Sequence, residues 1–327
     1  MLRSLSLPLV LAACAPLEPV FVDLPQERLF PEGILNDGTD TLWVTGFGDG
    51  SLLRIDEDDT VSVVKEPGED GLSSAVGLAA DLERGRLWIA NFSFDTFASD
   101  LKVFDLDSGD LIATVTPDAE LGPHFFNEMA IDEDGRVYVS DTLQPRIWTA
   151  GPALDEVTVL VEDARLANPA EDRPFGLNGL ALTPDGDGLV TSVMDRITQG
   201  GGRLVHIALD GLAVTDVALS GDLATFGGSD GMFFDGDQLV MVNVTPPAGL
   251  VTAEFDAEFA AAVLTNRPGA DDVLNRPTSS ALRGRRLFVV NSQLDHLIDD
   301  ENGAVGTYPD LPFQIVGVDA AEVLASE

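Results

Sequence analysis

The sequence predicts an all-β fold, a six-bladed β-propeller with four-stranded blades. Six times along the chain an apolar strand opening is followed by a tight Asp/Gly or Arg/Gly turn and then by a second apolar strand. The residues that head the first strands recur at spacings of 44, 51, 51, 52 and 49 residues. A repeat of about 45 to 50 residues, rich in β-branched and aromatic runs, is typical of blades arranged radially around an axis.

One residue heads each first strand, and we call its place in the repeat the head position. The head positions are, in order, Glu32, Val76, Asn127, Asn178, Asp230 and Ser279. A bulky apolar triplet follows each head residue at a distance of 8 to 11 residues and marks the return strand: Leu42-Trp43-Val44, Leu87-Trp88-Ile89, Val137-Tyr138-Val139, Leu189-Val190-Thr191, Leu239-Val240-Met241 and Leu287-Phe288-Val289. Helical periodicity is rare by comparison, which supports the all-β prediction.

The two ends of the chain are expected to close the ring. Val20 to Asp23 and Phe313 to Val318 both have strand character. An open propeller would leave bare strand edges, so we expect the N-terminal strand to complete a last blade made mostly by C-terminal residues. No linker divides the chain, and residues 20–327 are therefore predicted to form a single propeller domain.

The N-terminus contains the chain's single cysteine, Cys14, after an apolar stretch that ends in Leu11-Ala12-Ala13. Residues 1–13 resemble a bacterial lipoprotein signal peptide with its lipobox, which implies cleavage before Cys14 and lipid attachment to its sulfur. Residues 14–19 would then be a short tether that holds the propeller at the cell envelope, facing the periplasm. The alternative is that this stretch is a buried strand or a disordered tail.

The charge of the chain excludes some partners. There are 18 Lys and Arg residues against 56 Asp and Glu residues, a formal net charge of -38. Such an excess argues against binding nucleic acid or polyphosphate substrates by charge attraction. We interpret it as a solvated surface suited to a salty environment, with an acidic docking surface as the alternative. The sequence makes no prediction about an oligomeric partner.

Four of the head positions carry oxygen ligands. Innermost strands begin at one face of a propeller, so Glu32, Asn127, Asn178 and Asp230 are expected to converge on the central channel. Two carboxylates facing each other in a narrow channel repel unless a cation lies between them. All-oxygen coordination favours Ca²⁺, with Mg²⁺ or Mn²⁺ as alternatives, whereas zinc would favour His or Cys. The alternative is that these are ordinary Asn and Asp turn residues.

The motifs Pro31-Glu32-Gly33, Asn178-Gly179-Leu180 and Asp230-Gly231-Met232, with Asn127 between them, resemble the senescence marker protein/gluconolactonase family, which is related to paraoxonase and strictosidine synthase. The resemblance implies a divalent metal, often calcium, held by the four residues at these positions, and hydrolysis of lactones or esters. The chain departs from the family at Phe125, where gluconolactonases carry Arg, and at Val76, where paraoxonase-like enzymes carry His. A sugar-acid lactone is therefore not favoured.

Two carboxylates are candidates for the general base of a lactonase: Asp230, as the resemblance implies, and Glu128, next to Asn127. A phenylalanine-lined mouth around Phe125 would suit an apolar ester or lactone. Candidate substrate-rim residues are His124, Phe125, Asn91, Asp141, Asn243 and Asn291. The alternatives are that the Asn and Asp residues end strands by bonding backbone amides, and that His124 is a solvated loop residue.

The predicted function is a metal-dependent hydrolase of lactones or esters, anchored at the envelope and acting on a small molecule. The alternative is a non-catalytic periplasmic propeller that binds a ligand or a protein, with a central metal that is only structural. Fold alone does not separate the two.

Overall fold

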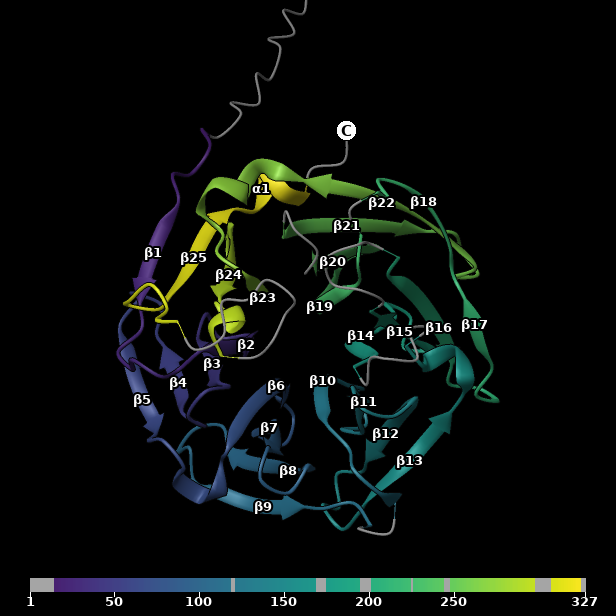
Figure 1. Ribbon diagram of the computed structural model, residues 1–327, viewed down its shortest axis with the longest axis horizontal. Coiled ribbons are helices and arrows are strands. Elements are labelled where there is room, and N and C mark those ends of the chain that lie inside the picture. Colours follow the sequence, from purple (N-terminus) through teal and green to yellow (C-terminus); the bar gives the residue numbers. More distant parts are fainter. Residues whose placement is uncertain are drawn as a thin grey trace, which may run out of the picture.

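The computed structural model describes residues 15–118, 121–168, 175–194, 201–224, 226–243, 248–297 and 307–324. Six sheets stand in a ring around a central axis (Figure 1). In the first four blades the strands pair antiparallel in sequence order from the axis outward. The predicted six-bladed β-propeller is therefore confirmed.

Five blades are formed by consecutive strands. The first three blades contain β2 (Pro31–Asn36), β3 (Leu42–Gly46), β4 (Leu52–Ile55) and β5 (Val61–Lys65); β6 (Ser74–Asp81), β7 (Arg86–Ser93), β8 (Ala98–Asp105) and β9 (Leu111–Val115); and β10 (Phe126–Ile131), β11 (Val137–Asp141), β12 (Arg146–Ala150) and β13 (Val157–Glu162). The fourth and fifth contain β14 (Leu177–Leu182), β15 (Gly188–Val193), β16 (Arg203–Ala208) and β17 (Val214–Asp216); and β19 (Ser229–Asp235), β20 (Gln238–Asn243), β21 (Gly249–Phe255) and β22 (Ala261–Arg267).

The sixth blade closes the ring as predicted. It contains β23 (Pro277–Arg283), β24 (Arg286–Asn291), β25 (Gln314–Asp319) and, as its outermost strand, β1 (Val20–Asp23). β1 pairs with β25 from Val20 opposite Gly317 to Asp23 opposite Gln314. The fifth blade has an extra outer strand, β18 (Ala218–Gly221), which runs parallel to β22.

The described helices are short. They comprise η1 (Glu69–Gly71), η3 (Ala164–Leu166), η4 (Pro268–Val273), η5 (Leu294–His296) and α1 (Ala320–Leu324). No helix within the described ranges is long and apolar enough to cross a membrane.

A β-bulge interrupts every innermost strand at the same place. The register shifts between Pro31 and Ile34 in β2, and the corresponding shift occurs in β6, β10, β14, β19 and β23. In the sixth blade the shift lies between Pro277 and Ser280, so the residue at the head position is Thr278. The assignment of Ser279 to this position was wrong by one residue. The bulge leaves each head residue outside the regular pairing, at the start of the strand.

The core consists of six hydrophobic clusters, one between each pair of neighbouring blades. The cluster between the second and third blades packs Trp88 against Trp148 and Phe126. The cluster between the sixth and first packs Phe288 and Ile315 against Leu42. Since each strand face must meet the face of the next blade, continuous apolar return strands such as Leu87-Trp88-Ile89 are buried on both sides.

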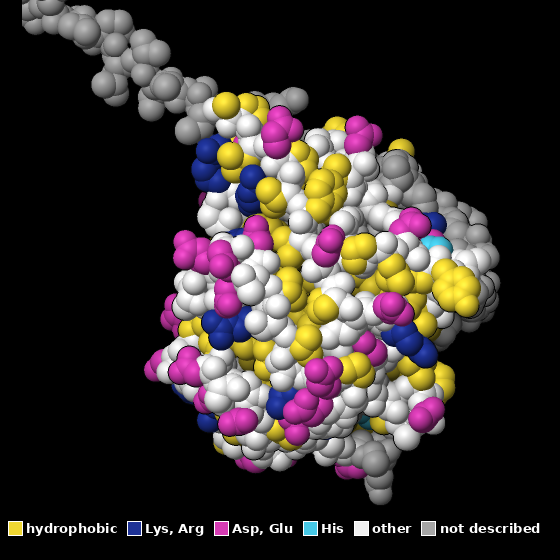
Figure 2. All heavy atoms as spheres, turned by 90° about the vertical axis from the view of Figure 1, so that its left-hand side faces the viewer, with side chains coloured by type: hydrophobic (Ala, Val, Ile, Leu, Met, Phe, Trp, Pro, Cys, Tyr) yellow, Lys and Arg dark blue, Asp and Glu magenta, His cyan; other side chains and the backbone are white. Residues whose placement is uncertain are grey.

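The two faces of the ring differ in composition. We call the face where the innermost strands begin the mouth face and the opposite one the turn face. The turn-face hairpins are short and acidic, as at Asp37 to Asp40, Asp56 to Asp59 and Asp132 to Asp134. Acidic side chains are also spread over the outer side of the ring seen in Figure 2, where Lys and Arg are fewer. Many of the excess acidic residues thus lie in turns and on the outer surface of the ring, where water solvates them.

Ring closure predicts a strong dependence of stability on β25. Ile315 is fully buried between β1 and β24, so Ile315→Ala should lower the free energy of unfolding by about 2–5 kcal/mol through lost burial and a residual cavity. Ile112→Ala, the same change on the half-exposed outer strand β9, should cost about 1 kcal/mol or less. Chemical denaturation measures both, and equal losses would contradict closure through β25.

Candidate metal centre

The four predicted ligands lie at the same level of four innermost strands. Glu32 is on β2, Asn127 on β10, Asn178 on β14 and Asp230 on β19, and their exposed fractions are only 5%, 7%, 5% and 8%. Their strands surround the axis at the centre of the ring (Figure 1). The charge of Asp230 acts on Glu32 across the ring, which places the two carboxylates within electrostatic reach of each other.

The residue after each head residue explains how neighbouring blades come so close. It is glycine in four blades: Gly33, Gly77, Gly179 and Gly231. A Cβ on Gly179 would lie 2.2 Å from the carbonyl oxygen of Asp230, and one on Gly77 would lie 2.4 Å from that of Asn127. Glycine here lets the backbone of one blade touch the head residue of the next, which sets the head residues at one depth.

Hydroxyl groups fix the head residues from the neighbouring blade. Thr278 Oγ1 donates to the carbonyl oxygen of Glu32 at 2.7 Å, and Ser140 Oγ donates to that of Asn178 at 2.6 Å. Both bonds join one blade to the next, so the backbone beneath the candidate ligands is held by contacts around the ring.

The two head asparagines are both bound through nitrogen. Asn127 Nδ2 donates to Thr142 Oγ1 at 2.9 Å, and Asn178 Nδ2 lies 3.5 Å from Met194 Sδ. The Asn178 side chain also bonds Asp230 and thereby opposes the rise in its pKa. Asn178 Oδ1 is buried and has no hydrogen-bond partner among the described residues. An orphaned buried carbonyl oxygen is costly unless a further group binds it.

The carboxyl groups carry strongly shifted pKa values. Burial, the charge of Asp230 and the charge of Glu128 raise the pKa of Glu32 well above its usual range. Burial and the charge of Glu128 raise the pKa of Asp230 to about 8. No Lys, Arg or His lies within ion-pair distance of these three carboxyl groups in the part of the chain that the structure describes. A cation between them would remove the repulsion.

These groups fit a hard divalent cation. Two carboxylates, the unpartnered oxygen of Asn178 and the amide of Asn127 together provide oxygen ligands from four blades, the ligand type that Ca²⁺ and Mg²⁺ prefer. Within the described ranges, no three His, Cys, Asp or Glu side chains come close enough to hold an ion on their own. Any cation here therefore needs the asparagine oxygens as well.

Glu128 takes the place that glycine occupies in four other blades. Its Oε1 accepts a hydrogen bond from the backbone N–H of Met129 at 3.0 Å, and the missing side chain of Gly77 leaves the space beside it. Burial raises its pKa to about 7, and its charge acts on both Glu32 and Asp230. The predicted second carboxylate thus lies next to the ligand cluster and outside the head positions.

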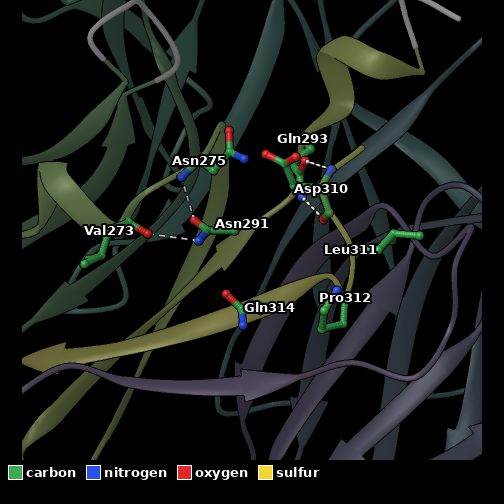
Figure 3. A pocket seen from close by; sticks show the side chains of 8 residues that line it. All are labelled: Val273, Asn275, Asn291, Gln293, Asp310, Leu311, Pro312 and Gln314. Carbon is green, nitrogen blue, oxygen red and sulfur yellow. Dashed lines mark hydrogen bonds between the residues drawn. The ribbon is translucent and has the colours of Figure 1, made fainter. Parts of the chain in front are cut away.

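Four predicted rim residues hold loops by bonds to the backbone. Asn91 accepts from Ser73 N, Asp141 from Phe125 N, Asn243 from Gly227 N and Asn291 from Asn275 N, at 2.7, 2.9, 3.2 and 2.9 Å. These bonds support the structural alternative for the four residues. Asn291 illustrates it in a polar pocket of the sixth blade, where its amide also donates to Val273 O and Gln293 bonds Asp310 (Figure 3).

The two other predicted rim residues are buried. His124 is only 3% exposed, its ring nitrogens face the carbonyl oxygens of Gly122 and Ser99, and its ring packs on Phe126 and Trp148. The solvated-loop alternative for His124 is therefore wrong, because the loop folds inward onto the blade core. Phe125 is 7% exposed and stacks on Phe92 with ring centroids 4.2 Å apart.

Sequence reasoning missed the residues that orient the asparagines. Thr142 and Met194 each directly follow the return-strand residue that pairs with the residue before the head residue. We call this the third position, and its described members are Phe47, Phe92, Thr142, Met194 and Ser292. Its side chains vary from blade to blade, so the repeat gives no common residue type, and only the register of the return strands could have revealed it.

No family model matches the sequence, and no curated protein matches it. Solved structures do resemble the chain. The major Malassezia sympodialis allergen Mala s 1 superposes with a TM-score of 0.70 at 18% identity, covering 94% of this chain and 98% of the allergen. A gluconolactonase from Xanthomonas campestris gives 0.59 at 16% identity, over 91% and 89% of the two chains. A calcium-binding protein, regucalcin, from Agrobacterium tumefaciens gives 0.56 at 16% identity, over 90% and 92%. The likeness shows that the chain shares its propeller fold with these proteins.

The raised pKa values predict how metal-free stability depends on pH. In the unfolded chain, Asp and Glu carboxyl groups have a pKa of about 4. In the folded protein, the pKa of Asp230 is raised to about 8 and that of Glu128 to about 7. Because folded pKa values are raised, the folded state binds more protons, and stability should fall as pH rises from about 4 to 8. The melting temperature in chelator at pH 5 and pH 8 measures this.

The measurement should be made at about 1 M salt, which screens the general surface repulsion. Asp230→Asn should flatten the profile, and saturating Ca²⁺ should raise the melting temperature more at pH 8 than at pH 5. A chelated protein that becomes more stable between pH 5 and pH 8 would contradict the assignment.

Proposed function

We propose that the protein is a divalent-cation-dependent hydrolase of lactones or esters, with Ca²⁺ as the favoured ion and Mg²⁺ or Mn²⁺ as alternatives. The observation that carries the proposal is the burial of Glu32 and Asp230 in mutual repulsion beside the unpartnered oxygen of Asn178. The names of two structural neighbours, a gluconolactonase and a calcium-binding protein, support the same class.

Glu32, Asn127, Asn178 and Asp230 would hold the ion. When bound, it would supply Lewis-acid polarisation of the ester carbonyl and stabilise negative charge on its oxygen. Thr142 would hold the amide nitrogen of Asn127, and Met194 and Asp230 that of Asn178, so that the amide oxygens remain available for the ion. The substrate is a small molecule, since the charge of -38 disfavours nucleic acid.

Glu128 is the better placed general base. A carboxylate bound directly to a cation loses basicity, so Asp230 is best suited to ligation. Glu128 lies beside the cluster at a position without a head-residue role, and burial gives its carboxyl a pKa of about 7. A base with a pKa near neutral can accept the proton of an attacking water at the pH where most enzymes work.

The test separates ion binding from proton transfer. Wild-type protein with Ca²⁺ should hydrolyse members of a panel of neutral lactones and aryl esters. Glu128→Gln should lower kcat by about 10²–10⁴-fold while keeping the Ca²⁺-dependent rise in melting temperature. Asn178→Ala should lose both, and Glu133→Gln, in an exposed turn of the turn face, should lose neither.

Two results would overturn the proposal. One is no turnover of any panel member by protein whose melting temperature rises with Ca²⁺, which supports the non-catalytic binding propeller instead. The other is turnover that persists unchanged in chelator and in Asn178→Ala.

A lipid anchor at Cys14 is part of the proposal, although Cys14 itself lies outside the described residues. The described tether is bound at the turn-face end of the sixth blade: Leu17 N donates to Asp319 Oδ2 at 2.8 Å, and Arg286 Nη1 donates to Glu18 O at 2.8 Å. β1 then runs from the turn face to the mouth face. An anchored molecule would hold its turn face to the membrane, with its mouth open to the periplasm.

Anchoring predicts that cells expressing the full chain incorporate labelled palmitate into it and that the protein sediments with membranes. Cys14→Ser should abolish the label and release the protein to the soluble fraction, because one thiol provides the only attachment point. An unlabelled wild-type protein, or a labelled Cys14→Ser variant, would contradict anchoring at this residue.

A further inference from the structure

Exposed apolar side chains gather at the mouth face. Of the twelve large hydrophobic residues that are exposed in the described ranges, seven lie in mouth-face loops, four on outer strands and only Leu82 in a turn of the turn face. The mouth-face residues include Phe94 and Phe97, which are 46% and 52% exposed, in the loop between β7 and β8. Exposed apolar surface that is concentrated on one face indicates a binding function.

Phe94 and Phe97 belong to a connected group of aromatic rings, which we call the aromatic ledge. Its five members are Phe47, Phe92, Phe94, Phe97 and Phe125, from three blades. The Phe92 ring stacks on that of Phe125, with 4.2 Å between the ring centroids. Its edge-on contacts with Phe94 and Phe97 have centroid distances of 4.9 and 6.0 Å. Phe94 also contacts Phe47 edge-on, with 5.6 Å between the centroids. The buried rings hold the two outer rings in place, at little cost in entropy when a ligand binds.

The aromatic ledge reaches the head positions. Phe47 and Phe92 occupy the third position of the first and second blades, where Thr142 and Met194 touch head asparagines in the third and fourth. Both pack in one cluster with Val76, the apolar head residue. Val76 of the second blade is thus the one apolar head residue, and the third-position phenylalanines of the first and second blades extend this apolar sector toward the surface.

The charges around the mouth narrow the occupant further. The net charge of -38 would repel an anionic ligand. Hydrogen-bonding groups for a sugar are absent from the five rings themselves. The surface thus fits an uncharged molecule with a large apolar or aromatic group.

We propose that the substrates are neutral esters or lactones carrying a bulky apolar group, and that this group binds on Phe94 and Phe97 while the ester lies over the head residues. This assignment rests on the proposed hydrolase function and names its substrate class. A carbonyl held at the polar side leaves the remainder of the molecule on the apolar side, because the third-position phenylalanines connect the two.

The test compares Phe94→Ser/Phe97→Ser with Phe21→Ser, a control in which an equally exposed phenylalanine, 51%, is removed from outer strand β1. Two readouts are used: kcat/KM for a γ-lactone with a phenyl substituent relative to unsubstituted γ-butyrolactone, and affinity for the neutral fluorophore N-phenyl-1-naphthylamine in the presence of chelator. The double variant should lower the kcat/KM ratio and the probe affinity at least about tenfold, the effect of losing one or two buried ring contacts. Phe21→Ser should change neither.

The outcomes separate the two proposals. Probe binding that depends on Phe94 and Phe97 in a protein without hydrolytic activity supports the ledge and overturns the hydrolase. Hydrolysis with an unchanged ratio and unchanged probe affinity in the double variant overturns the ledge alone. A wild-type dimer that dissociates in the double variant also overturns it, since a second copy then covers these rings. Phe94→Leu/Phe97→Leu, which keeps apolar volume, repeats the comparison if the serine variant unfolds.

Discussion

The repulsion between buried carboxylates at the axis is the constraint on which the rest of the site depends. Glu32 and Asp230 are brought together by a ring that must close, because the β1–β25 pairing holds the sixth blade against the first. Glycine after the head residues removes the steric barrier to this approach. The folded ring can relieve the repulsion by binding protons or by binding a cation. A cation would bind both carboxylates and the unpartnered oxygen of Asn178 together, whereas a protonated carboxyl would donate a single hydrogen bond.

The sequence predicted the propeller well because every blade repeats the same physical solution. Return strands that are buried on both faces require long apolar runs, and tight turns favour Asp and Gly. Both patterns can be recognised in the sequence even though no family model matches it. The head residues were found for the same reason. The exception is the sixth blade, where Ser280 lies opposite Val289 at the place that Met232 occupies opposite Met241 in the fifth. Because Ser280 is polar where the other strands have an apolar residue, the sequence pattern placed the head residue at Ser279, one residue after Thr278.

The sequence repeat did not predict where individual side chains point. Asn and Asp at strand ends are equally suited to face a substrate and to bond a loop backbone, and only the bonds of Asp141 to Phe125 N, Leu143 N and Gln144 N show that it holds a loop. His124 is similar, because its burial depends on an inward turn of the preceding loop that no local signal marks. Glu128 was found as a neighbour of Asn127, but its place beside Gly77 is a property of the blade interface.

The division between strands and loops implies that the candidate metal site and the proposed substrate surface can change independently. The candidate ligands stand on bulged innermost strands that are fixed by inter-blade bonds such as that from Thr278 to Glu32. Phe94 and Phe97 stand on one hairpin loop, where sequence change costs little stability. The third position joins the two, since Thr142 and Phe92 occupy equivalent places with opposite chemistry. A propeller of this kind can therefore keep a candidate cation site at its axis while the third position and the adjoining loops change what binds above it.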